Sequence, residues 1–221
     1  MSGQTAAAAA ATAVAAACTV IVARRAAAAP NPRRPAFIAW TIGFALFTVA
    51  AAALWLGAAN GWTDAVFRVY YLTGGILVVA YLAVGELLLV LPGRRVTRMA
   101  AATMLFVTFA AVAAVLAARV DAAALASAGA TPPNDALEGT WPKVMAIVLN
   151  SVGTVVLLVG SAASARRRHD PRPLLVAAGV AVIAVASTAT RAGSYAAFAL
   201  GQAAGITLIL LGLVTRRLGP R

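Results

Sequence analysis

The residue of this chain best placed to do chemistry is Glu86, the only acidic residue inside a long apolar segment. A charged side chain at the centre of a membrane helix costs about 2.5–3.5 kcal/mol on insertion scales, so its presence there suggests a function. Burial disfavours the ionised form of a carboxyl group, which makes proton binding the first hypothesis for Glu86. The structural alternative is a glutamate paired with Arg94 or Arg95, or hydrogen-bonded to a threonine of a neighbouring helix.

A second group of polar residues falls near one end of several apolar segments, and we expect it to converge on an outward-facing pocket. Its members are Arg68, Tyr71, Asn150, Arg191 and Gln202. Two guanidinium groups among neutral hydrogen-bonding side chains would favour a small polar or anionic ligand. For each residue alone, hydrogen bonding between helices is the more ordinary explanation, at about 0.6 kcal/mol per bond. The predicted convergence is what supports a site.

Arg68 has two further predicted relationships on its own helix. It follows Asp64 by four residues, so an ion pair that anchors the end of the helix at the membrane surface is expected. It also precedes Glu86 by 18 residues, which is five turns at about 3.6 residues per turn. A straight α-helix would therefore present both residues on one face.

Most known catalytic machinery is excluded by what the sequence lacks. The one histidine, His169, lies in a run of arginines, and the one cysteine, Cys18, lies inside an apolar segment. We find no metal-binding cluster, nucleotide-binding loop or nucleophile motif, so no catalytic, cofactor-binding or metal-binding residue is predicted. The one lysine, Lys143, lies at the start of a segment, whereas a retinal Schiff base needs a lysine deep within a late helix.

The elements that must position these residues are apolar helices. The 221 residues are 62% hydrophobic and only 11% charged, against about 25% charged in soluble domains. A helix that crosses a hydrocarbon layer of about 30 Å needs roughly 20 apolar residues. We therefore predict an all-α integral membrane protein, a seven-transmembrane-helix bundle in a single domain, 1–221, with an outer loop at 119–143. The predicted spans are 5–23, 36–59, 66–91, 99–118, 144–163, 174–190 and 195–214.

Two of these spans rest on particular arguments. The first is mostly alanine, but Arg24 and Arg25 follow its apolar run, which favours an uncleaved helix over a signal peptide. The stretch 174–214 would be about 60 Å long as one helix, twice the thickness of the hydrocarbon layer. We therefore expect the chain to reverse at residues 191–194, where a charge, a glycine and a serine occur.

The arrangement of basic residues predicts the orientation. Fourteen of the 18 lysines and arginines fall in four of the gaps between spans, and these are every second gap. They are Arg24, Arg25, Arg33, Arg34, Arg94, Arg95, Arg98, Arg166, Arg167, Arg168, Arg172, Arg216, Arg217 and Arg221. This positive-inside pattern predicts an outside N-terminus and a cytoplasmic C-terminus in a plasma membrane. It also accounts for the net charge of +12, so nucleic-acid binding is not expected, and the composition suggests a bacterial source.

The third segment carries a resemblance to other proteins. The stretch Phe67–Gly75, continued by Tyr81–Gly85, resembles a segment of uncharacterised multi-pass membrane proteins from actinobacteria. The resemblance implies the membrane class and transfers no functional residue.

We therefore expect a non-enzymatic protein that contacts the lipid bilayer and binds or transports a small solute. Two alternatives remain open from the sequence. One is a structural or accessory subunit that docks a membrane-protein partner. The other is a membrane enzyme that modifies lipid.

Overall fold

The computed structural model describes residues 3–133, 135–189 and 195–215, and its regular structure is almost entirely helical. The longer helices are α1 (Gly3–Ala28), α2 (Arg34–Asn60), α4 (Val78–Val90), α5 (Arg94–Ala117), α7 (Thr140–Arg168), α8 (Leu174–Ala189) and α9 (Tyr195–Val214). The shorter elements are α3 (Asp64–Tyr70), the π-helix η1 (Tyr71–Leu77), α6 (Ala122–Ser127), β1 (Arg119–Val120) and β2 (Leu137–Glu138).

Six stretches of helix among the described residues are long and apolar enough to cross a membrane. Because α3, η1 and α4 run on continuously, residues 64–90 count as one of them. The predicted spans at 5–23, 36–59, 66–91, 99–118, 144–163 and 195–214 each correspond to one of these stretches. The remaining predicted span, 174–190, forms the shorter apolar helix α8, so a seventh crossing stays a prediction.

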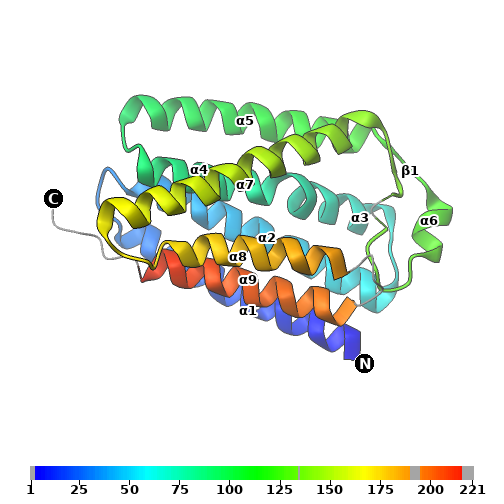
Figure 1. The fold of residues 1–221 in the computed structure, drawn as a ribbon. Helices are drawn as coiled ribbons and strands as arrows, with labels where there is room; N and C mark the ends of the chain where they lie inside the picture. Colours follow the sequence, from blue (N-terminus) through cyan, green and yellow to red (C-terminus); the bar gives the residue numbers. More distant parts are fainter. Residues whose placement is uncertain (1–2, 134, 190–194, 216–221) are drawn as a thin grey trace.

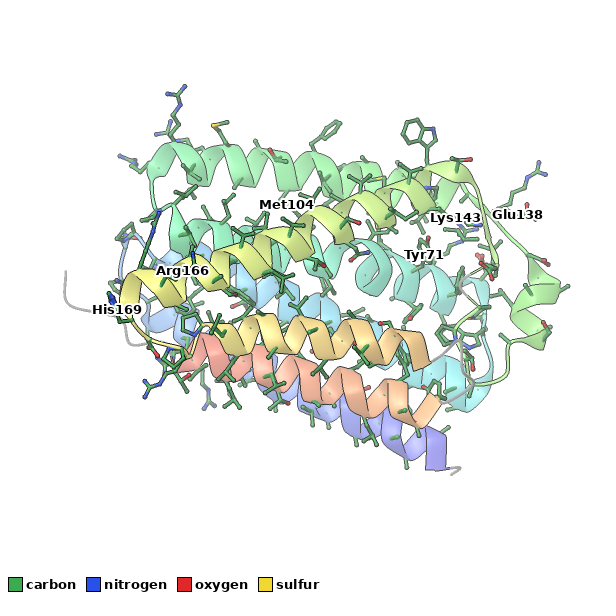
Figure 2. The ribbon with its side chains drawn as sticks, in the orientation of Figure 1. Tyr71, Met104, Glu138, Lys143, Arg166 and His169 are labelled. Carbon is green, nitrogen blue, oxygen red and sulfur yellow. The ribbon has the colours of Figure 1, made fainter. Side chains whose placement is uncertain are left out.

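The long helices lie side by side, and successive ones run in opposite directions (Figure 1). The loops α1–α2, α4–α5 and α7–α8 therefore meet at one end of the bundle, which we call the basic end. Arg166 and His169 lie at this end, whereas Glu138 and Lys143 lie at the opposite end (Figure 2). The expected reversal at residues 191–194 falls outside the described residues, but α8 and α9 on either side of it are antiparallel neighbours.

Large apolar side chains cover much of the outside of this bundle. On α5, Phe106 is 73% exposed and Phe109 is 68% exposed. In water such a surface would be unfavourable, whereas in a bilayer it meets hydrocarbon. Together with the six long apolar helices, it identifies the chain as a multi-pass membrane protein.

The alanine-rich α1 packs between α2 and α9. Its buried residues recur every three or four positions, which is the spacing of a single helix face: Ala8, Ala11, Ala15, Cys18, Val22 and Ala26. The hydroxyls of Thr19 on α1 and Thr48 on α2 are 2.9 Å apart and share a hydrogen bond. Small side chains let the helices approach closely.

The contact between α8 and α9 depends on glycine. A Cβ atom built at Gly179 would lie 2.5 Å from the carbonyl oxygen of Gly205, and one built at Gly201 would lie 2.3 Å from the Cβ of Ala186. Neither separation is sterically possible without movement of backbone or side chain. The two helices therefore form a closely packed pair.

The predicted outer loop is more ordered than its sequence indicates. The carboxylate of Asp121 accepts hydrogen bonds from the backbone N–H groups of Ala123 and Ala124 at the start of α6, in the manner of an N-cap. The strands β1 and β2 pair Arg119 with Glu138 in antiparallel register, and Leu137 is fully buried. The loop thus packs onto the end of the bundle. Its two-residue strands are too short to show a periodicity in the sequence.

The π-helix η1 interrupts the third membrane stretch at the glycine pair Gly74-Gly75. Its wider turns follow from hydrogen bonds such as the one from the N–H of Val78 to the carbonyl of Thr73, five residues earlier. One extra residue rotates everything beyond it by about 100° relative to a straight α-helix. The predicted common face of Arg68 and Glu86 is therefore wrong, and the two residues contact different helices.

Candidate functional site

A cavity of about 610 Å³, which we call the main cavity, lies among α1, α2, the third membrane stretch, α7, α8 and α9. Alanine, valine, leucine, isoleucine and phenylalanine make up most of its wall. Its polar lining residues are Tyr70, Tyr71, Asn150, Ser151, Ser187 and Gln202. Three members of the predicted pocket, Tyr71, Asn150 and Gln202, are thus brought together around one space.

Asn150 joins α7 to the π-helical wall of this cavity. Its Nδ2 donates one hydrogen bond of 2.7 Å to the carbonyl of Gly75 and another of 2.8 Å to the carbonyl of Ala146. Two carbonyl acceptors determine the orientation of the amide, because the reversed orientation would set oxygen against oxygen. Both amide hydrogens are thereby used. The carbonyl Oδ1 accepts no hydrogen bond from another described residue and remains an acceptor for a ligand.

Gln202 provides polar groups on another side of the cavity. Its Nε2 lies 3.4 Å from the hydroxyl of Ser187 on α8, and that hydroxyl donates to the carbonyl of Ile183 at 2.8 Å. These side chains link α9 to α8. Tyr71 is only 8% exposed and stacks at a tilt on Phe67, with ring centroids 5.9 Å apart. The lining therefore holds several neutral hydrogen-bonding groups in an otherwise apolar wall.

The main cavity reaches the surface between α7 and α8. Among its lining residues, the exposed ones are Ile147, Ser151 and Ser187, and all three belong to these two helices. Figure 1 shows α7 and α8 diverging from the loop that joins them at the basic end. In a membrane, an opening on the side of the bundle faces lipid.

Arg68 lies outside the main cavity and has structural partners instead. Its Nε is 2.9 Å from both carboxylate oxygens of Asp64, so the ion pair predicted from the four-residue spacing is present. Its Nη1 donates to the carbonyls of Val115 and Ala118 at the end of α5, the latter at 3.0 Å. The last carbonyls of a helix lack intrahelical donors and carry partial negative charge, so a guanidinium there satisfies them. The spacing within the sequence could not reveal this partner, because it lies on another helix.

Arg191, the other cation of the predicted pocket, lies outside the described residues. Among those described, no arginine, lysine, aspartate or glutamate lines the main cavity. Nor do three histidine, cysteine, aspartate or glutamate side chains come together among them as a metal site would require.

Glu86 is fully buried in a separate place, between α4 and α7. The hydroxyl of Ser164 lies 3.4 Å from its Oε1, and a Cβ built at Gly160 would lie 2.6 Å from its Cγ. Nearby, the hydroxyl of Ser161 and the indole N–H of Trp40 are buried without a hydrogen-bond partner among the described residues. Glu86 does not line the main cavity. The sequence held one signal of this contact: Gly160 and Ser164 are one helical turn apart, so they lie on the same face of α7.

Comparison of the chain with protein-family models, with curated proteins and with solved structures finds no match. The geometry of the site is therefore what indicates the function.

Proposed function

We propose that this multi-pass membrane protein binds a small, uncharged and largely apolar molecule in the main cavity. The volume of about 610 Å³ lies within the range of about 300–1,000 Å³ usual for ligand sites. The observation that carries the proposal is that the exposed lining residues all belong to α7 and α8. A ligand that enters between these two helices comes from the bilayer.

The charge of the lining decides the class of ligand. The sequence favoured a polar or anionic ligand because it placed Arg68 and Arg191 in the pocket. Arg68 is instead engaged with Asp64 and with the end of α5, and Arg191 lies outside the described residues. The described lining offers instead the free Oδ1 of Asn150 and the hydroxyl and amide groups of its neighbours. A neutral amphipathic molecule with one or two hydrogen-bonding groups matches this lining. Glu86 stays a predicted protonation site outside the proposed binding site.

The cavity also favours binding over the two alternatives. A purely structural subunit would need no cavity of this size. A lipid-modifying enzyme would need reacting groups in the cavity, and the described lining contains no carboxylate, histidine or cysteine.

A photoreactive fatty alcohol tests the proposal, since it is uncharged and partitions into bilayers. We expect it to label α7, α8 and η1 in the reconstituted protein, and a fatty acid of equal length to label them less. Ser151→Trp should block labelling by filling the opening. Val152→Trp is the matched control, because Val152 is 58% exposed and does not line the cavity. Equal labelling of both variants, or labelling confined to the lipid-facing α5, would refute the proposal.

The orientation forms part of the same proposal. We infer a plasma-membrane protein, of bacterial source, whose basic end faces the cytoplasm, since the described arginine-rich loops meet there. In a Cys18→Ala background, Ser127→Cys on α6 should react with a membrane-impermeant maleimide in intact cells. Asn31→Cys at the basic end should react only after permeabilisation. The reverse result would invert the topology.

A further inference from the structure

A second pocket, of about 350 Å³, lies at the basic end, and we call it the basic-end pocket. It is formed by the turn between α1 and α2, the end of α4 and the last turns of α7. Its lining residues are Pro30, Asn31, Pro32, Arg33, Leu89, Val90, Pro92, Ser164 and Arg167. It shares no lining residue with the main cavity.

Two cations from distant parts of the chain meet in this pocket. Arg33 comes from the α1–α2 turn and Arg167 from the end of α7, and neither guanidinium makes a hydrogen bond or ion pair with another described residue. Asp170 at the same end is already paired with Arg172, with Nε and Oδ1 3.9 Å apart. Guanidinium groups that lack carboxylate partners and converge on one space favour an anion, above all a phosphate, whose oxygens match their donors.

The hydroxyl of Ser164 separates the pocket from Glu86. Ser164 is 6% exposed, and its hydroxyl donates a hydrogen bond to the Glu86 carboxyl group. It therefore offers only lone pairs to the pocket, and the donors for a phosphate are Arg33, Arg167 and the amide of Asn31. Even with Glu86 ionised, the lining that the structure describes contains two cations and no acidic residue.

The rest of the wall is apolar and identifies the source of the phosphate. Leu89, Val90 and Pro92 border the arginines on one side, and Pro30 and Pro32 lie on the other. A free phosphate ion gains nothing from such a wall, whereas the glycerol and upper acyl groups of a phospholipid do. The pocket also lies where the helices end, and the ends of membrane-spanning helices meet the lipid headgroups. The described lining holds no acidic or aromatic residue that could receive the cationic group of a zwitterionic lipid.

We propose that the basic-end pocket binds the phosphate of an anionic phospholipid in the leaflet that faces the basic end. Basic pockets between membrane helices hold lipid headgroups in this way. The proposal is independent of the ligand proposed for the main cavity.

The test measures binding of fluorescent phosphatidylglycerol to the full-length protein in detergent micelles. We expect the double variant Arg33→Gln/Arg167→Gln to weaken binding about 100-fold, about tenfold for each charge-assisted hydrogen bond lost. The matched control is Arg94→Gln/Arg95→Gln, which removes the same charge from exposed positions outside the pocket. This control should weaken binding less than about fivefold, because only long-range attraction is lost.

A charge-neutral variant makes the test independent of electrostatics and of folding defects. Val90→Trp fills the pocket and should also abolish binding, while size-exclusion elution reports whether each variant stays folded. Phosphatidylcholine should bind at least about tenfold more weakly than phosphatidylglycerol to the unmodified protein. The proposal is overturned if the two double variants bind alike, if Val90→Trp binds normally while folded, or if inorganic phosphate at millimolar concentration displaces the lipid completely.

Discussion

Replacing Asn150 by leucine tests the link between α7 and the π-helix. Leucine has nearly the same shape as asparagine, so packing is kept while the hydrogen bonds of Nδ2 to the carbonyls of Gly75 and Ala146 are lost. Of these two, the bond to Gly75 matters more. Ala146 lies four residues earlier on the same helix, so its carbonyl keeps the backbone N–H of Asn150 as an intrahelical donor.

The magnitude follows from the one bond between helices. A bond of 2.7 Å is short for N–H···O, and interhelical bonds in membranes average about 0.6 kcal/mol with a maximum near 1.7. The carbonyl of Gly75 also lies in the π-helical segment, where the regular ladder is interrupted. We therefore expect Asn150→Leu to lower the free energy of unfolding by about 1–1.5 kcal/mol, in the upper part of that range.

The assay is equilibrium unfolding in mixed SDS micelles, combined with isotope-edited infrared spectroscopy of a ¹³C-labelled Gly75 carbonyl. Thr154→Val on the same helix is the matched control, because the hydroxyl of Thr154 makes no hydrogen bond with another described residue. This variant should change the free energy of unfolding by less than about 0.3 kcal/mol. In Asn150→Leu the carbonyl band should move to higher frequency. If stability and carbonyl frequency both stay unchanged, the π-helix does not depend on this amide and the reasoning is refuted.

Two further predictions concern contacts between helices and use the same unfolding assay. Arg68→Met should cost about 1–2 kcal/mol, because the carbonyls at the end of α5 lose a charged donor. Asp64→Asn should cost less than about 0.5 kcal/mol, because that carboxylate is 57% exposed; equal effects would show that the ion pair alone matters. Gly179→Val should cost about 1–3 kcal/mol by forcing α8 away from α9. Gly3→Val, with open space around the site, should be nearly neutral, and an equal loss there would point to helix propensity instead.

The helical elements followed from the sequence because each depends on local composition. An apolar run of membrane length predicts its helix wherever the neighbours lie, and the span expected at 36–59 became α2, Arg34–Asn60. The meeting of Tyr71, Asn150 and Gln202 was also predictable, since all three lie near the same end of their helices. The number of residues between a side chain and the end of its span gives the depth of that side chain in the membrane.

The direction in which a side chain points around its helix axis is harder to predict than its depth in the membrane. The angle between two side chains on one helix depends on the helical geometry of every residue between them. The π-helix η1 changes the direction of Glu86 relative to Arg68, and no periodicity in the sequence reports it. The glycine pair Gly74-Gly75 was the one available signal. The partners of Arg68 at the end of α5 and of Glu86 at Ser164 are likewise non-local, since they depend on which helices become neighbours.

The position of α1 between α2 and α9 has a consequence for biosynthesis. The first of the described helices to leave the ribosome packs against the last of them to be made. An alanine side chain gains little free energy from contact with lipid. Until α9 is made, α1 packs against α2 and leaves a stripe of small residues exposed. The packing of α1 therefore stays incomplete until α9 has been synthesised. During that interval the stripe is open to an insertion chaperone or to a protease.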